Sequence, residues 1–181
     1  MQGLVFTALS DMVIDKMGLG MWNDVLNSVN PVSGGVYTKG MQYDDDELMA
    51  IVADISERTQ IPVTDLVRTF GQYIFKYLFA SSPADLSKVD NVRDFLLLID
   101  GVIHKEVKRL YPQAYLPKFD YDTSTDGVLV MYYQSKRKLC HLSEGLIFSA
   151  AAQFNQTVTI DHPECMHNGA EKCKLIISIL D

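Results

Sequence analysis

The spacing of apolar residues changes at two prolines, Pro112 and Pro117. Before them, apolar residues recur every three or four positions, which is the period of a helix with one buried face. After them, 126-DGVLVMYYQS-135 alternates and is rich in Val and Tyr, which is typical of a strand. This order predicts an α+β fold: a helical N-terminal part, then an antiparallel sheet with one packed helix.

Acidic residues and prolines mark the ends of the predicted elements. The run Asp44–Glu47 suits the positive end of a helix dipole, and Pro62 and Pro83 bracket another helix. Helices are therefore expected at 3–17, 20–29, 44–59, 63–80, 92–111 and 141–154, with strands at 126–135, 156–160 and 173–180.

Composition limits the class of protein. At 181 residues, with 48% hydrophobic and 22% charged residues, we expect one domain with a sizeable core. The net charge of −7 argues against nucleic acid as the main partner. We expect no signal peptide and no membrane insertion, because the apolar runs are short. Three cysteines leave one unpaired, so we expect a cytoplasmic protein rather than a secreted disulfide protein.

His104 stands among the apolar positions of the predicted helix 92–111, one turn after Gly101. It could be a half-buried histidine whose hydrogen bonds are satisfied. It could also be the single axial ligand of a haem iron, which needs one imidazole projecting into an apolar pocket. The histidine alone leaves both interpretations open.

A second feature is the pattern Y-x-S-x-R at Tyr133, Ser135 and Arg137. Alternate residues of a strand point to the same side, so two hydroxyls and a guanidinium should converge. Such a group suits a carboxylate, because the guanidinium binds both oxygens and the hydroxyls add donors. An ordinary polar strand edge is the alternative.

The two features together resemble the haem-nitric oxide/oxygen binding (H-NOX) family, which includes the haem domain of soluble guanylate cyclase and stand-alone bacterial gas sensors. The likeness extends to Met1 and Gly3, to the acidic run 44–47 and to S-K-R-K at 135–138. It implies a distal helical part over about 1–60 and a proximal part with the sheet over 61–181, with haem b between them. The implied roles are proximal iron ligand for His104, propionate binding for Tyr133, Ser135 and Arg137, and haem distortion for Pro117.

The resemblance also implies a gas preference. Members that hold oxygen place a distal tyrosine where this chain has Leu142. We therefore expect binding of nitric oxide and carbon monoxide without stable binding of oxygen, which depends more on a hydrogen-bond donor. Tyr73 or Tyr77 could enter the pocket if the alignment is shifted. The distal pocket is expected to consist of Val5, Leu9, Ile74, Leu78 and Leu142.

A sensor of this kind passes its signal on. The resemblance implies release of His104 on nitric oxide binding and a separate partner, either a two-component histidine kinase or a cyclic-di-GMP enzyme. No acid–base constellation is visible, so we expect a regulatory protein and not an enzyme.

All three cysteines fall near the C-terminal end. His162-x2-Cys165-x7-Cys173, together with Cys140, supplies the nitrogen and sulfur ligands of a structural zinc site. His141 and His167 are alternative fourth ligands, and three reduced cysteines without metal is the simpler interpretation. A zinc-thiolate tail also resembles vinyl-reductase-type domains, which would make the chain a zinc-bearing module for a small hydrophobic ligand, without haem.

Overall fold

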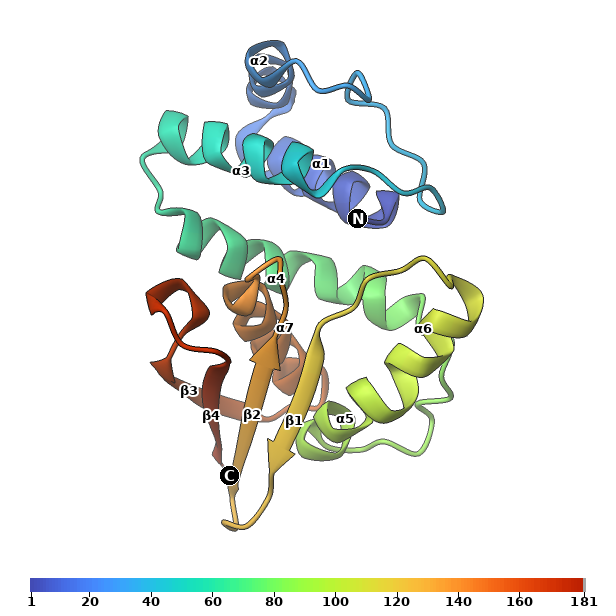
Figure 1. The fold of residues 1–181 in the computed structure, drawn as a ribbon, viewed down its shortest axis with the longest axis vertical. Coiled ribbons are helices and arrows are strands. Elements are labelled where there is room, and N and C mark those ends of the chain that lie inside the picture. Colours follow the sequence, from blue (N-terminus) through green and yellow to red (C-terminus); the bar gives the residue numbers. More distant parts are fainter. Residues whose placement is uncertain (181) are drawn as a thin grey trace.

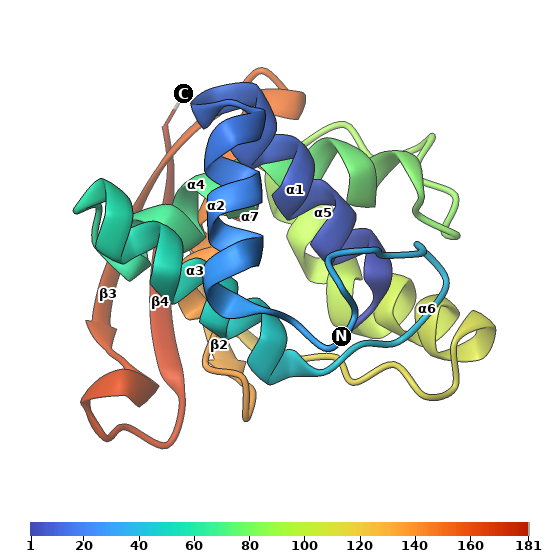
Figure 2. The ribbon, with the colours of Figure 1, turned by 90° about the horizontal axis from the view of Figure 1, so that it is seen from above.

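The computed structural model describes residues 1–180. Helices α1–α3 form one end of the molecule, the sheet lies at the other, and α4 runs between them (Figure 1). Seen from above, α1 and α2 cover α4 (Figure 2). The helices are α1 Gly3–Met17, α2 Leu19–Val29, α3 Asp45–Thr59, α4 Val63–Ala80, α5 Val92–Leu98, α6 His104–Leu110 and α7 Cys140–Gln153, and the strands are β1 Lys118–Asp122, β2 Val128–Gln134, β3 Thr157–Glu164 and β4 Cys173–Leu180.

The α+β prediction is confirmed, and so are the predicted helices and strands apart from two differences. The sheet is antiparallel throughout, in the order β1-β2-β4-β3. Strand β1 was missed because it has only five residues and alternates charged with aromatic side chains. It lies at the edge of the sheet, where β2 is its one neighbouring strand within residues 1–180, and charged side chains are common at such edges.

The second difference is in the predicted helix 92–111, which is not one α-helix. A π-helical turn, Ile99–Ile103, separates α5 from α6. The carbonyl oxygen of Leu96 accepts a hydrogen bond from the hydroxyl of Tyr121 at 2.7 Å, which offers that carbonyl a partner outside the helix. Such turns are frequent at functional sites, and this one ends directly before His104.

Helices α4 and α7 touch backbone to backbone. A Cβ atom added at Gly145 would lie 2.0 Å from the carbonyl oxygen of Arg68, and one added at Gly71 would lie 2.3 Å from that of Leu142. Only glycine permits this approach. It fixes the first turns of α7 against the middle of α4.

Two clusters of buried apolar side chains make up the core. One cluster is formed by the four helices α1, α2, α3 and α4. The other is formed by the sheet together with α5 and α7. Leu66 and Ile74 of α4 belong to the first cluster and Phe75 to the second, so the helical core extends past residue 60. Within residues 1–180, no helix is long and apolar enough to cross a bilayer.

Candidate functional site

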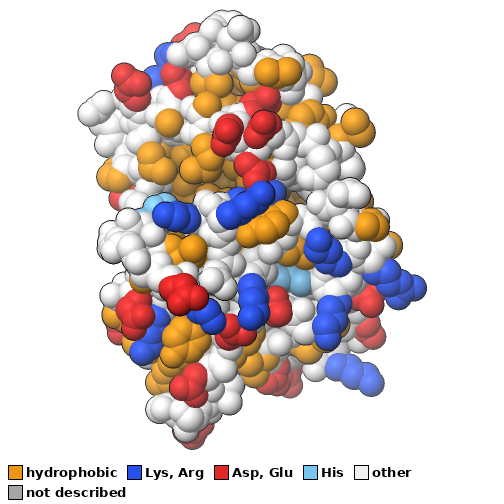
Figure 3. Space-filling view, viewed as in Figure 1, with side chains coloured by type: hydrophobic (Ala, Val, Ile, Leu, Met, Phe, Trp, Pro, Cys, Tyr) orange, Lys and Arg blue, Asp and Glu red, His pale blue; other side chains and the backbone are white. Residues whose placement is uncertain are grey.

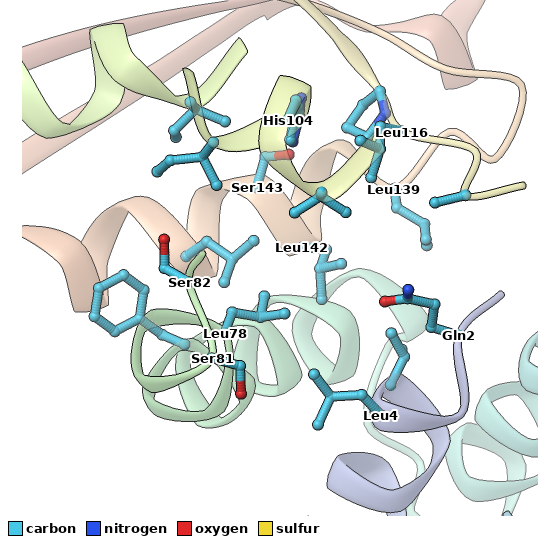
Figure 4. Close-up of a pocket in the computed structure, with 18 of the residues that line it drawn as sticks. Gln2, Leu4, Leu78, Ser81, Ser82, His104, Leu116, Leu139, Leu142 and Ser143 are labelled. Atoms are coloured by element: carbon cyan, nitrogen blue, oxygen red, sulfur yellow. The ribbon is translucent and has the colours of Figure 1, made fainter. Parts of the chain in front are cut away.

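A cavity of about 490 Å³ lies between the two clusters. Its volume is within the range typical of cofactor pockets. His104 enters it from one side, and Leu4, Leu78 and Leu142 face His104 from the other (Figure 4). The residues of the sequence-based prediction that line it are Val5, Leu78, His104, Pro117, Tyr133, Ser135, Arg137 and Leu142.

His104 is held by a contact at one ring nitrogen and by stacking on its ring face. Its Nδ1 lies 3.3 Å from Oδ1 of Asp100, one turn earlier in the chain, and its ring stacks on Phe119 at 5.6 Å. Burial lowers the pKa of His104, and this effect outweighs the opposing effect of Asp100. The neutral imidazole is therefore favoured. A metal-bound histidine commonly pairs its second ring N–H with a carboxylate in this way, and the contact with Asp100 leaves Nε2 available as a ligand. Gly101 is exposed and does not line the cavity.

The Y-x-S-x-R residues reach the cavity, but not by strand alternation. Strand β2 ends at Gln134, so Tyr133 is its last inward-facing residue, while Ser135 and Arg137 belong to the following turn. Lys138 closes that turn with a φ of 50°. The convergence was predicted from the wrong geometry, because a turn rather than the pleat brings these side chains together.

Each of these three side chains has N–H or O–H groups that are not used in the hydrogen bonds described next. The guanidinium of Arg137 uses Nε and Nη2 on Asp45 at 2.6 and 2.9 Å, and Nη1 on the carbonyl of Tyr115. Three of its five N–H groups are engaged, which leaves two. The hydroxyls of Tyr133 and Ser135 each accept a backbone N–H, so their protons are available to an anion. Figure 3 shows acidic side chains directly above basic ones on this face.

The apolar wall opposite His104 is smaller than predicted. Val5, Leu78 and Leu142 line the cavity, whereas Leu9 and Ile74 do not. Leu9 lies one helical turn after Val5, and Ile74 one turn before Leu78, so both continue the same helix faces into the buried core. They pack beneath the wall instead of forming it.

Two tyrosines that could have entered the pocket stay outside it. Tyr77 directs its hydroxyl to Oδ2 of Asp11 at 3.3 Å, and its ring lies 6.0 Å from that of Tyr73. Polar residues that sequence reasoning missed also line the cavity, among them Gln2 and Ser143. Gln2 differs from the others in one respect. Its Nε2 is buried without a hydrogen-bond partner among the described residues. This donor can pair with a polar group on whatever fills the cavity.

The three cysteines meet beside the N-terminal end of α7, which begins at Cys140. The Sγ of Cys165 lies 3.7 Å from that of Cys140 and 3.9 Å from that of Cys173. Tetrahedral ligands about 2.3 Å from zinc place neighbouring sulfurs about 3.8 Å apart. Burial and the neighbouring thiols raise the pKa of Cys140. A ligand atom of His162 lies within 4.8 Å of all three sulfurs.

His162 fits the fourth position better than the other two histidines. Its Nδ1 lies 2.6 Å from Oε1 of Glu144, and its Nε2 is buried without a partner among residues 1–180. His167 instead pairs Nε2 with the carbonyl of Lys138 at 2.7 Å, and His141 directs Nδ1 to Glu144. The donor set is therefore the three thiols and one nitrogen that tetrahedral zinc takes.

Comparison with known proteins gives one consistent result. The Haem-NO-binding family model matches residues 2–162. Soluble guanylate cyclase gcy-35 of Caenorhabditis elegans is 22% identical over 170 residues, which is 88% of this chain and 24% of that protein. The chain thus spans about a quarter of the length of this curated relative.

Solved structures resemble the whole chain. An H-NOX protein from S. oneidensis in the Fe(II)NO ligation state has a TM-score of 0.93 and 36% identity, with all of both chains covered. The unliganded Fe(II) H-NOX protein from K. algicida has a TM-score of 0.92 and 30% identity, covering this chain and 97% of that one. The vinyl-reductase-type alternative gains no support from these matches.

Proposed function

Because this chain belongs to the Haem-NO-binding family, we propose that it is a haem-based sensor that binds nitric oxide and carbon monoxide but does not hold oxygen. The observation that carries the proposal is His104 facing an apolar wall across a cavity of cofactor size. Haem, when bound, supplies the iron to which a diatomic gas is a ligand.

The chain's own residues divide the work of holding haem. His104 offers Nε2 to the iron while Asp100 fixes its ring. Tyr133, Ser135 and Arg137 offer their remaining donors to the propionates, and Pro117 lies in the cavity wall where it can press on the porphyrin.

Gas preference follows from the opposite wall. Oxygen depends on a hydrogen-bond donor, whereas nitric oxide and carbon monoxide depend on one far less. At Leu142 the wall offers a side chain without a donor, and Val5 and Leu78 beside the cavity are also apolar. Gln2 and Ser143 are polar residues that also line the cavity, and a donor from either that reached the gas would favour oxygen.

The test is an absorption spectrum of the reduced, haem-loaded protein under argon, in air and with nitric oxide. We expect a Soret band that shifts with nitric oxide and is unchanged by air. A stable spectral change in air would mean that Gln2 or another donor reaches the iron. His104→Gly should lose the wild-type spectrum and regain it on addition of free imidazole, which would enter the space of the lost side chain.

We propose a regulatory role without turnover, in which the signal passes to a separate histidine kinase or cyclic-di-GMP enzyme. Membership of the family supports this role. Each candidate partner would be assayed for kinase or cyclase activity with the unliganded and the nitric-oxide-bound protein. The partner is the one whose rate differs between the two.

We also propose that Cys140, His162, Cys165 and Cys173 hold a structural zinc ion. The sulfur–sulfur distances of 3.7 and 3.9 Å and the unpaired Nε2 of His162 support this site. Elemental analysis of protein purified without chelator should give one zinc per chain, and Cys165→Ser should lose it. Equal zinc content in both proteins would contradict the proposed zinc site.

A further inference from the structure

Glu144 connects the thiol cluster to the centre of the molecule. Its residue is only 4% exposed, and both of its oxygens are engaged. Oε1 lies 2.6 Å from Nδ1 of His162, and Oε2 accepts from Nε of Arg68 at 2.7 Å and lies 3.1 Å from Nδ1 of His141. Three side chains from α4, α7 and β3 thus converge on one buried carboxylate.

The contact with His162 determines how that ring is used. A carboxylate oxygen accepts and does not donate, so the proton of the imidazole lies on Nδ1. The lone pair is then on Nε2, the atom that has no partner among residues 1–180 and belongs to the side chain next to three sulfurs. The same contact fixes the rotation of the ring about its Cβ–Cγ bond.

The contact with Arg68 holds the carboxylate itself. Arg68 lies on α4, directly before the position where Gly71 touches α7, and its Nη1 is bound in turn by Asp65 at 2.7 Å. A buried acid that served only to pair with arginine would need one partner. Here the second oxygen is directed at a histidine, at the shortest distance in the network.

We propose that Glu144 is the positioning residue of the metal site: it sets the tautomer and orientation of His162 and anchors that ligand to α4 through Arg68. This role rests on the zinc site proposed above. Carboxylates that orient metal-bound histidines typically contribute 10–100-fold to metal affinity.

The test is a cobalt(II) titration of metal-free protein, followed by thiolate-to-cobalt absorption in competition with a chelator. Glu144→Gln should bind cobalt about 10–100-fold more weakly, because the glutamine amide has one oxygen acceptor and cannot accept from both Arg68 and His162. Asp65→Asn is the matched control: its exposed side chain contacts only the far end of Arg68, so cobalt affinity should stay within about twofold of wild type.

A second readout separates positioning from stability. In zinc-loaded wild type, long-range ¹H–¹⁵N spectra should show His162 protonated at Nδ1, with slow exchange of that proton. Glu144→Gln should lose the slow exchange. If that variant does not fold, Glu144→Asp, which keeps the charge but shortens the reach, is judged by the same two measurements.

The outcomes distinguish this role from the metal site itself. If wild-type protein showed no cobalt–thiolate absorption, both the proposed metal site and the proposed role of Glu144 would be wrong. Cobalt binding that is lost in Cys165→Ser but equal in wild type and in the folded Glu144 variant would leave the site standing and overturn the role.

Discussion

At the scale of single residues, His104 shows how one hydrogen bond prepares an atom for another task. Its Nδ1 is occupied by Asp100, so only Nε2 can serve as a ligand. The sequence contains this signal as an acid four positions before the histidine, a spacing at which two side chains meet on one helix face.

We expect Asp100→Asn to weaken the bond between His104 and iron. The carboxylate draws the Nδ1 proton and makes the imidazole a stronger donor, and a neutral amide does so less. Resonance Raman spectra of the reduced protein should therefore show a lower iron–histidine stretching frequency. Glu106→Gln, on the same helix but paired with Arg109, is the control and should leave the frequency unchanged.

We expect Leu142→Tyr to give the protein a stable oxygen complex. Leu142 faces His104 across the cavity, and a tyrosine there would supply a hydroxyl donor that Leu142 does not. The measurement is the Soret band in air, with Leu142→Phe as the control for added size. Oxygen binding by both variants would show that space rather than the donor had limited it.

At the scale of elements, the close crossing of α4 and α7 is the most demanding contact in the fold. Gly145→Ala would place a Cβ against the backbone of Arg68, so the helices would have to move apart. We expect a loss of about 1–3 kcal/mol in the free energy of unfolding, as for other overpacked sites.

The measurement is urea unfolding, with Gly20→Ala as the control. Gly20 lies in α2, and a Cβ added there meets nothing within 4 Å. That substitution should be neutral or raise the free energy of unfolding by up to about 1 kcal/mol, because alanine is the better helix former. Equal effects of the two substitutions would contradict the packing argument.

Elements with strong periodicity could be predicted from the sequence, and those determined by neighbours could not. Helices α1 and α4 begin and end where the pattern placed them. The break between α5 and α6 was missed, and the hydroxyl that bonds the Leu96 carbonyl beside it belongs to Tyr121, from a strand that was also missed. The turn after β2 was read as strand for the same reason, since Arg137 is drawn to Asp45 on α3.

At the scale of the whole molecule, the site could be predicted only where residue type alone indicates chemistry. His104 and Arg137 were singled out because, with Tyr133 and Ser135, they resemble the H-NOX pattern, and the cysteines because all three fall near the C-terminal end. Gln2 and Glu144 were missed because neither is unusual in sequence. Each acquires its meaning from burial, which brings Gln2 to the cavity and Glu144 to three partners distant in the chain.

The contact between Asp45 and Arg137 joins the helical end to the sheet and should make stability depend on pH. Burial raises the pKa of Asp45, but hydrogen bonds from Arg137 and from the Met1 ammonium outweigh it and hold the pKa below the ordinary 3.8. A carboxyl with a depressed folded-state pKa stabilises the fold above its unfolded-state pKa and loses this effect as pH falls.

We expect Asp45→Asn to lower the free energy of unfolding by about 1–3 kcal/mol at pH 6. The difference from wild type should shrink as pH falls below 3.8, through the lower pKa of the folded state. Urea unfolding of haem-free protein at pH 6 and pH 3 measures this. Asp46→Asn, at an exposed neighbour, is the control, and a difference as large at pH 3 as at pH 6 would contradict the ion-pair account.

The first turns of α7 carry a consequence for anyone who would redesign this protein. Residues 140–145 contain a thiol of the cysteine cluster, the cavity residue Leu142, the buried acid Glu144 and the glycine that touches α4. A library that randomised this segment to change gas selectivity would therefore also sample variants in metal content and stability. Selectivity is better evolved at Val5 of α1 and Leu78 of α4. Both line the same wall, and neither belongs to the cysteine cluster, the Glu144 contacts or the glycine crossing.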